Sequence, residues 1–279
     1  MAHSIATAVI TGAGSGLGRA LALQLAARRV RLVVADVHQA RCEEIAQLVE
    51  QTGGQATPLV VDVADPSQMA RLADEADRVL GRIDLVVNNA GVAAGGPLAA
   101  TSLDDWRWIV GINLWGVIHG CHEFVPRLVR QGGGAILNVA SLAGIVCAPG
   151  MSSYNVTKAA VIALSETLRA ELAEDHVGVT VLCPGFFRTN LLETMRVSDP
   201  ELRELAAASF ASSRMTADQV AAAALDGAQR GGRVLWRLKR LVPGHFARIL
   251  ANRRLQRLGV RRAQASARAA QEGGAAARP

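Results

Sequence analysis

Short apolar runs alternate with helix-length segments along most of the chain, and this alternation constrains the fold more than any other feature. Strands that are continuously apolar are typical of a sheet covered on both faces. Two such strands joined by a helix of about ten or more residues form a right-handed crossover in a parallel sheet. The expected strands cover residues 5–11, 31–36, 57–62, 83–88, 135–140 and 177–183, and the expected helices cover 18–29, 38–52, 66–80, 102–131 and 152–174. We predict one doubly wound α/β domain, with a parallel sheet of six to seven strands and helices on both faces.

The regular alternation ends at Pro184. Residues 186–213 are expected to form a loop with one or two short helices, and residues 216–229 another helix. A seventh strand near residues 230–236 would be short or absent. We assign residues 1–236 to the α/β domain and 237–262 to a basic amphipathic extension. Residues 263–279, mostly Ala, Gly, Arg and Gln, are expected to be a disordered tail.

A glycine-rich loop, TGAGSGLG at residues 11–18, joins the first expected strand to the first expected helix. In this context backbone N–H groups and a helix N-terminus receive a pyrophosphate, and glycine allows the phosphates to approach closely. The spacing is G-x-x-x-G-x-G and differs from the more usual G-x-G-x-x-G, so the loop taken alone is also compatible with a plain turn.

Asp36 ends the second expected strand, 24 residues after Gly12. A carboxylate at this place accepts hydrogen bonds from both ribose hydroxyls of an adenosine and repels a 2′-phosphate. Its presence therefore favours NAD over NADP. The alternative for Asp36 alone is that it caps the following helix.

Four further motifs follow the later strands in order: Asn88-Asn89-Ala90-Gly91, Ser141, Tyr154-Asn155-Val156-Thr157-Lys158 and Pro184-Gly185. Together with the glycine loop they resemble the classical short-chain dehydrogenases/reductases over residues 5–230. Tyr154 is the only tyrosine of the chain and lies 13 residues after Ser141. The resemblance implies a Rossmann-type fold and an enzyme that transfers hydride between a nicotinamide and an alcohol or ketone.

The expected chemistry explains these residue types. Dehydrogenation requires a base for the hydroxyl proton, and a tyrosine with its ordinary pKa of about 10 is a poor base at neutral pH. The ammonium of Lys158 lies on the same helical face as Tyr154, and with an oxidised nicotinamide it is expected to lower the tyrosine pKa. Tyr154 is thus the expected general acid/base and Ser141 the residue that holds the reacting oxygen. The resemblance adds Asn113 as the residue that holds a water of the proton relay, where the alternative is a helix-kink or capping asparagine.

The cofactor site implied by the resemblance extends along the whole predicted edge of the sheet. Lys158 would bind the nicotinamide ribose, Asp62 and Val63 the adenine, and Thr189 the carboxamide. Ser15 stands where NADP-preferring relatives often carry a basic residue, and Arg41 is expected on the outer face of its helix. The expected cofactor-binding residues are Gly12, Gly14, Ser15, Gly16, Leu17, Gly18, Asp36, Asp62, Val63, Asn89, Ala90, Gly91, Tyr154, Lys158, Pro184, Gly185 and Thr189.

The loop after Pro184 is the expected lid of the substrate pocket. Its apolar residues favour a lipophilic secondary alcohol or ketone, and the expected substrate residues are Ser141, Tyr154, Phe186, Phe187, Leu191, Leu192 and Met195. One alternative is a 3-oxoacyl-thioester reductase that uses NADP, against which Asp36 argues. Another is a non-catalytic protein that senses a dinucleotide or serves as a scaffold.

Charge is distributed unevenly along the chain. Residues 230–279 hold 13 of the 30 lysines and arginines and one of the 24 acids, so this segment carries +12 and residues 1–229 carry −6. An apolar stripe from Phe246 to Leu258 is opposed by arginines, which suits an anionic membrane surface. The alternatives are packing on the acidic domain, packing on a neighbouring subunit, and nucleic acid, which we do not expect as a partner.

Other features limit the function classes. The four cysteines, Cys42, Cys121, Cys147 and Cys183, show no zinc or C-x-x-C spacing and are expected to be reduced thiols. His119 and His122 have no evident third ligand, so no metal site is predicted. Trp106, Trp108 and Trp115 are expected to pack in the core or at a subunit interface. With no signal peptide or spanning segment in the pattern, we expect a cytoplasmic homodimer or homotetramer, with possible contact at the inner membrane face.

Overall fold

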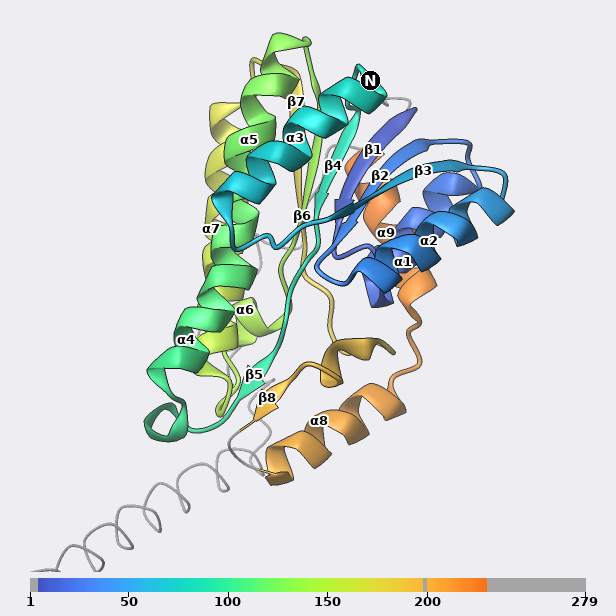
Figure 1. The fold of residues 1–279 in the computed structure, drawn as a ribbon. Helices are drawn as coiled ribbons and strands as arrows, with labels where there is room; N and C mark the ends of the chain where they lie inside the picture. Colours follow the sequence, from blue (N-terminus) through green and yellow to red (C-terminus); the bar gives the residue numbers. More distant parts are fainter. Residues whose placement is uncertain (1–4, 198–199, 230–279) are drawn as a thin grey trace, which may run out of the picture.

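The computed structural model describes residues 5–197 and 200–229 of the protein. Its main sheet has six strands, all parallel, in the order β3-β2-β1-β4-β6-β7 (Figure 1). The strands are β1 (Thr7–Thr11), β2 (Arg31–Asp36), β3 (Gln55–Val60), β4 (Leu85–Asn88), β6 (Gly134–Val139) and β7 (Val177–Leu182). The order runs outward in both directions from β1 and β4, which confirms the predicted doubly wound α/β fold. The region proposed for a seventh strand lies outside the described residues.

The helices in the described part of the chain largely follow the predicted pattern. They are α1 (Gly16–Ala26), α2 (Gln39–Gln51), α3 (Pro66–Leu80), α4 (Leu103–Val110), α5 (Gly116–Arg130), α6 (Ala143–Val146), α7 (Ser152–Glu171), α8 (Pro200–Ser212) and α9 (Ala217–Gln229). The ends have local causes. Asp65 accepts hydrogen bonds from the N–H groups of Ser67 and Gln68 and so caps α3, whereas Gly53, with φ of +76°, ends the turn after α2.

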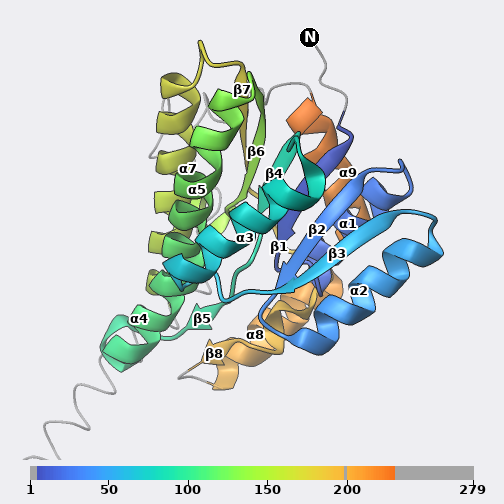
Figure 2. The same ribbon diagram turned by 45° about the horizontal axis from the view of Figure 1, so that its top comes forward.

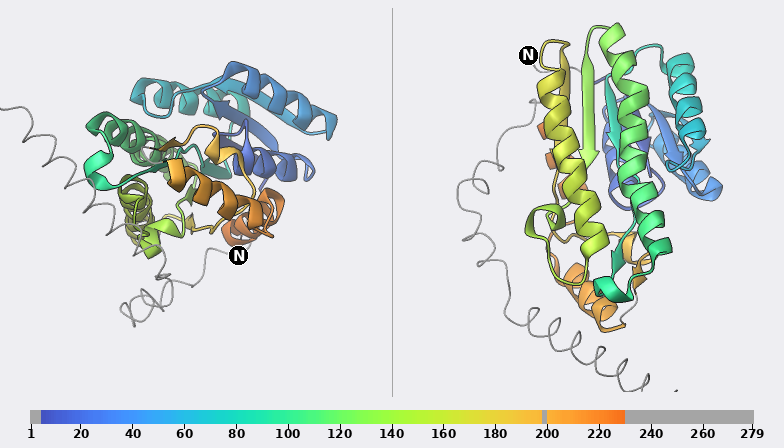
Figure 3. Two further views of the ribbon diagram at one scale, coloured as in Figure 1. Left: turned by 90° about the horizontal axis from the view of Figure 1, so that it is seen from below. Right: turned by 90° about the vertical axis from the view of Figure 1, so that its left-hand side faces the viewer.

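Two hydrophobic layers sandwich the sheet, because alternate strand residues point to opposite faces. On one face Ile10 and Val34 pack with α1, α2 and α9; on the other face Val9 and Val33 pack with α3, α5 and α7. Figure 2 and the right-hand view of Figure 3 show α3, α5 and α7 side by side over their face. Strand β3 departs from the prediction that every strand is covered on both faces. It forms the edge of the sheet and is only partly buried, as its Pro58 and its polar residues suit.

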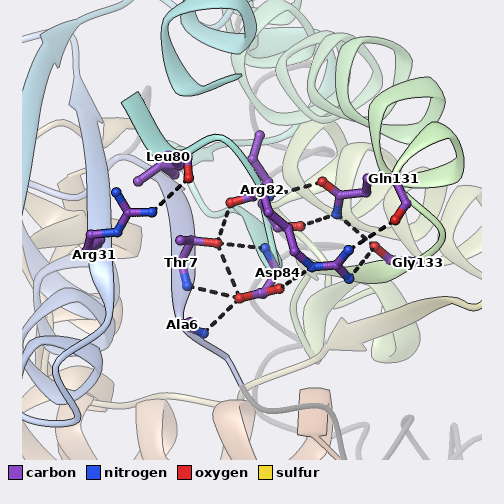
Figure 4. A network of polar contacts seen from close by, with 9 residues as sticks. Ala6, Thr7, Arg31, Leu80, Arg82, Asp84, Gln131 and Gly133 are labelled. Carbon is purple, nitrogen blue, oxygen red and sulfur yellow. Dashed lines mark hydrogen bonds and ion pairs between the residues drawn. The ribbon is translucent and has the colours of Figure 1, made fainter. Parts of the chain in front are cut away.

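A polar network fixes the end of the sheet opposite to the glycine loop (Figure 4). The carboxylate of Asp84 accepts hydrogen bonds from the N–H groups of Ala6 and Thr7 at 2.8 and 3.1 Å. The guanidinium of Arg82 contacts Asp84 at 3.0 Å and donates to the carbonyl of Gln131 at 3.0 Å. These contacts join the start of β1, the start of β4 and the turn before β6. The network therefore holds together the amino-terminal end of the sheet. The loops at the carboxyl ends of the strands take no part in it and lie at the opposite end, where a site can form.

The long helical region predicted over residues 102–131 is interrupted. Between α4 and α5 the chain forms a π-helical segment, Gly111–Trp115, which adds a residue to one turn and changes which side chains face inward. Asn113 lies in this segment and is fully buried.

The segment after β7 has more structure than the predicted loop with short helices. Strand β8 (Arg196–Val197) pairs in parallel with β5 (Ala94–Gly95), so the lid is held to the chain that follows β4. The pair and α8 lie beyond the carboxyl ends of the main strands (Figure 1, and Figure 3, left). In the described part of the chain, no helix is both long and apolar enough to span a membrane.

Candidate active site

A cavity of about 510 Å³ opens at the carboxyl ends of the strands, where the loops after all six strands meet the lid. Its walls carry residues from the glycine loop, from the ends of β2 and β3, from the segment after β4, from α4, from α7 and from the lid. Its lining includes Gly12, Ser15, Gly16, Leu17, Asp36, Asp62, Val63, Asn89, Ala90, Gly91, Tyr154, Lys158, Pro184 and Thr189 from the predicted cofactor set. Gly14, Gly18 and Gly185, also predicted, are not part of the lining.

The glycine loop packs tightly between α1 and the chain after β4. The side-chain amide of Asn89 donates to the carbonyls of Thr11 and Gly12 at 2.9 and 3.0 Å. At Gly12, whose φ is +62°, a Cβ would lie 2.8 Å from the Cα of Ala90, so only glycine fits. Ser15 begins α1 without a side-chain capping bond, which leaves the backbone N–H groups of the first turn available to an anion.

Asp36 is buried at the end of β2 and does not cap α2. Its carboxylate accepts hydrogen bonds from the N–H of Gly14 and the N–H of His38, each at 3.1 Å. Asp36 thus holds the glycine loop while lining the cavity. The expectation that Arg41 faces outward was wrong. Arg41 lines the cavity, because Gly14 leaves room for its side chain, and its guanidinium pairs with Glu193 of the lid at 3.2 Å.

The predicted adenine residues lie on the loop after β3. The carboxylate of Asp62 accepts from the N–H of Ala64 at 2.9 Å, and the backbone N–H of Asp62 donates to Gln68 at 3.0 Å. Val63 is buried against Gly116 of α5. These contacts hold the loop rigidly at the cavity wall.

Tyr154 and Lys158 lie one turn apart on α7, and Ser141 follows β6 beside them. The hydroxyl of Tyr154 is hydrogen-bonded to Ser141. The ammonium of Lys158 lies 5.8 Å from the centre of the tyrosine ring and donates to the carbonyl of Val139 at 2.9 Å. Ser141 does not itself line the cavity, and it reaches the site through the hydroxyl of Tyr154.

Asn113 joins this group from the π-helical segment. Its Oδ1 accepts from the N–H of Val92 and its Nδ2 donates to the carbonyl of Val92, both at 2.8 Å. A Cβ on Gly91 would lie 3.3 Å from Asn113 Oδ1 and 3.5 Å from Lys158 Nζ. The side chains of Asn113 and Lys158 therefore both lie close to Gly91.

The electrostatics of the pair differ from the expectation. We expected Lys158 together with an oxidised nicotinamide to lower the pKa of Tyr154. In the protein without a nicotinamide, burial instead raises the tyrosine pKa above its ordinary value, and the hydrogen bond from Ser141 opposes that shift only in part. Burial also lowers the pKa of Lys158 to about 8, against a smaller opposing effect of Cys183. Desolvation dominates at both groups, because both side chains are almost completely removed from water.

The lid residues divide into two groups. Phe187 and Leu191 line the cavity as predicted for substrate residues, and Thr189 lies with its hydroxyl over Gly16. The other three predicted substrate residues are not in the lining. Phe186 is half exposed and packs edge-on against Phe210, with 5.2 Å between ring centres. Leu192 and Met195 belong to an apolar cluster that supports Tyr154.

Several residues of the cavity lining were not predicted from the sequence, and Trp108 and Arg107 are two of them. Trp108, expected in the core or at an interface, lines the cavity and packs against the cluster around Tyr154. Arg107 lines the cavity beside it. No sequence signal distinguished Trp108 from Trp106 or Trp115. Among the described residues no three His, Cys, Asp or Glu side chains form a metal-binding group, and His119 instead places Nδ1 3.0 Å from the carbonyl of Val63.

Comparison with known proteins gives one consistent match. The family model described as short chain dehydrogenase matches residues 6–199. The probable oxidoreductase EphD of Mycobacterium tuberculosis is 39% identical over 186 residues, which are 66% of this chain and 31% of that protein, so the chain corresponds to only about a third of its length. The 1-deoxy-11-beta-hydroxypentalenate dehydrogenase of Streptomyces avermitilis is 37% identical over 77% of this chain and 78% of its own. A short-chain dehydrogenase/reductase from Burkholderia phymatum, solved in complex with NAD, superposes with a TM-score of 0.79 at 33% identity, covering 83% of this chain and 88% of its own.

Proposed function

The chain belongs to the short-chain dehydrogenase/reductase family of oxidoreductases, and from this premise we propose that it is an NAD-dependent enzyme that interconverts a lipophilic secondary alcohol and its ketone. One observation carries the proposal. Tyr154, Lys158 and the glycine loop line the same cavity, and Ser141 is hydrogen-bonded to the hydroxyl of Tyr154.

The residues at the cavity fit a dinucleotide. The uncapped first turn of α1 offers N–H donors for the pyrophosphate, and Asp36 offers a carboxylate for ribose hydroxyls. Gly12 lines the cavity and has no side chain, so a phosphate can approach its backbone. A bound NAD would supply the hydride acceptor at this site. Lys158, with its ammonium beside the site, would hold the nicotinamide ribose.

The remaining steps belong to the protein. The hydroxyl of Ser141 donates to the reacting oxygen and keeps it next to Tyr154. For oxidation Tyr154 would act as the phenolate and take the hydroxyl proton as the C–H bond breaks, so the alcohol loses one proton to Tyr154 and one hydride and becomes a ketone. In reduction Tyr154 returns the proton to the oxygen. Because burial favours the neutral phenol, Tyr154 in the free protein is prepared to act as the acid.

Preference for NAD rests on charge at the adenosine end. A buried carboxylate at Asp36 would repel a 2′-phosphate, and Ser15 supplies no positive charge to offset it. Arg41, the nearby cation, is paired with Glu193. The relative from Burkholderia phymatum was solved with NAD, which agrees with this preference.

A lipophilic substrate is supported by the apolar cluster beside Tyr154, which includes Ile109, Met195 and Leu191. The related Streptomyces avermitilis protein is described as a dehydrogenase of a hydroxypentalenate. The test is a turnover assay with a panel of secondary alcohols and ketones, with NAD and NADP compared for each. Turnover of lipophilic members with NAD is expected. Turnover restricted to polar sugars, or equal or better use of NADP, would contradict the proposal.

We also propose that the protein is a homo-oligomer and that the basic segment 237–262, which lies outside the described residues, binds anionic membranes weakly. Each arginine near such a surface contributes about 1 kcal/mol, and screening at physiological salt limits its range to about 8 Å. Sedimentation with anionic vesicles at low and high salt tests this, with and without residues 237–279. The shortened chain must first show the same oligomeric state. Failure of the full-length chain to pellet at low salt would leave packing on the protein itself as the role of the segment.

A further inference from the structure

Arg196, a side chain of the lid, contacts two residues of α4. The guanidinium carbon of Arg196 lies 3.9 Å from the ring centre of Trp108, and Nη1 of Arg196 lies 3.1 Å from Oδ1 of Asp105. Asp105 is fixed in turn by the hydroxyl of Ser102, which donates to Oδ2 at 2.8 Å. Asp105 and Trp108 are three residues apart on α4 and therefore share one helical face. A single arginine thus covers one face of the indole and anchors itself beside it.

The backbone of Arg196 is held independently. Its N–H donates to the carbonyl of Ala93 at 3.1 Å, within the pairing of β8 with β5. Next to it, Arg203 of α8 donates to the carbonyl of Met195 at 2.7 Å. Several contacts therefore hold the lid in position, and Arg196 in addition contacts the ring of Trp108.

Trp108 lines the cavity and also packs against the apolar cluster that contains Tyr154. The guanidinium covers one face of the indole ring. A substrate in the cavity would therefore contact the part of the indole that the guanidinium leaves uncovered. Aromatic rings pack on an indole with offset or edge-to-face geometry, which a flexible aliphatic chain does not use.

The arginines around the cavity are already paired with acids. Among the described residues, Arg41 pairs with Glu193, Arg107 pairs with Asp104 and Arg196 pairs with Asp105. Lys158 donates to Val139 and lies where the nicotinamide ribose is expected. An anionic substrate would have to displace an acid from one of these arginines, and a neutral substrate would not.

We propose that Trp108, oriented by Arg196 and Asp105, is a specificity-determining residue that selects a neutral alcohol or ketone carrying a flat ring next to the reacting carbon. This inference rests on the proposed alcohol dehydrogenase function and names the class of its substrate. Arg196 and Asp105 are positioning residues, because they act through the indole.

The test compares two alcohols with the same number of carbon atoms, 1-phenylethanol and 2-octanol, in Trp108→Leu, Arg196→Met and Arg203→Met. An aromatic contact of the usual strength corresponds to about a three- to tenfold difference in affinity. In Trp108→Leu and Arg196→Met, KM for 1-phenylethanol should rise by that factor relative to 2-octanol, with kcat changed less than about twofold. Arg196→Met should still fold, because partly exposed ion pairs contribute little to stability.

Arg203→Met is the matched control, since Arg203 also holds the lid but not Trp108. It should leave the ratio of the two KM values unchanged. If Arg203→Met shifts the ratio as much as Arg196→Met does, the lid position and not the indole sets specificity, and the proposal is overturned. An unchanged ratio in Trp108→Leu overturns it as well.

Binding separates this inference from the proposed reaction. The affinity of the NAD-saturated protein for each alcohol is measured by calorimetry. If neither alcohol is oxidised but the aromatic preference is present and is lost in Trp108→Leu, the substrate class stands and the proposed reaction fails. If the unmodified protein binds neither alcohol, or if Trp108→Leu weakens binding of both equally, the substrate class is wrong whatever the reaction.

Discussion

Asn113 and Val92 are joined by two reciprocal hydrogen bonds. The Oδ1 of Asn113 accepts from the N–H of Val92 and its Nδ2 donates to the carbonyl of the same residue, both at 2.8 Å. This pairing fastens the π-helical segment to the chain that follows β4. Gly91 and Lys158 lie directly beside it, so one side chain sets the distance between the loop after β4 and the catalytic end of α7.

Replacing Asn113 with Leu should therefore weaken both fold and catalysis. The two partly buried backbone groups of Val92 would lose their partners, at a cost of about 1–3 kcal/mol in the free energy of unfolding. Turnover should fall by about 10² or more, because the loop beside Lys158 loses its support. Chemical unfolding and steady-state kinetics check this, with Asn113→Asp as the variant that keeps the Oδ1 acceptor. A loss of stability below about 0.5 kcal/mol would show that the pairing contributes little.

Tyr154→Phe keeps the ring and removes the hydroxyl that contacts Ser141. Turnover should fall by at least about 10³, the range expected for loss of an acid/base group together with its hydrogen bond to substrate. Affinity for NAD, measured by quenching of protein fluorescence, should remain within about twofold, since Tyr154 is not required to hold the dinucleotide. Near-normal turnover in this variant would exclude Tyr154 as the base.

Asp36→Ala removes a carboxylate that both supports the glycine loop and is expected to bind ribose. The value of kcat/KM for NAD should fall by about 10- to 100-fold, which corresponds to about 1.4–2.8 kcal/mol. The value for NADP should fall less or rise, because the repulsion of its phosphate is removed. Asp36→Asn is the informative control. It keeps an oxygen that accepts from the N–H of Gly14 but carries no charge. Equal losses with both cofactors would assign Asp36 to loop support alone.

Gly144 lets α6 lie directly on α7 at the level of Lys158. A Cβ at Gly144 would lie 2.6 Å from the backbone of Lys158 and of Ala159. Gly144→Ala should cost about 1–3 kcal/mol of stability, as overpacking does, and should lower kcat by displacing Ser141 from Tyr154. In Gly227→Ala the new Cβ would meet only Thr180, at 3.8 Å, so this helix variant should be neutral or stabilised by up to about 1 kcal/mol. Thermal unfolding and kinetics of the two variants provide the comparison, and equal behaviour would contradict it.

The lowered pKa of Lys158 makes stability depend on pH. Between the folded pKa of about 8 and the ordinary value of 10.5, the unfolded chain binds more protons at this group than the folded one. Stability from Lys158 should therefore rise as the pH increases from 8 toward 10.5. Below pH 8 the buried charge carries its full cost, so Lys158→Met should be more stable than the unmodified protein there, by an amount on the order of 2 kcal/mol. Urea unfolding of both proteins at several pH values tests this, and a difference independent of pH would refute it.

Much of this protein could be predicted from its sequence, because the relevant signals are local. Apolar runs and helix lengths predicted the order of the six main strands and of the helices between them correctly. Asp36, Tyr154 and Lys158 were found because their positions relative to strand ends and helix turns place them at one edge of a parallel sheet.

The tertiary structure decided what depends on packing between distant segments. The π-helical turn around Asn113 interrupts the helical pattern between α4 and α5, and no signal in the sequence indicated it. Trp108 was not predicted as a pocket residue. Phe186 and Phe187 are neighbours of the same chemistry, yet only Phe187 lines the cavity, because the fold of the lid rather than composition sets their directions. The direction of the Tyr154 pKa shift also depended on burial, which is a property of the whole packed chain. Local sequence thus determined the elements and the reactive groups, whereas the close packing of segments far apart in the chain determined the shape of the pocket; Arg196 and Asp105, for example, are 91 residues apart.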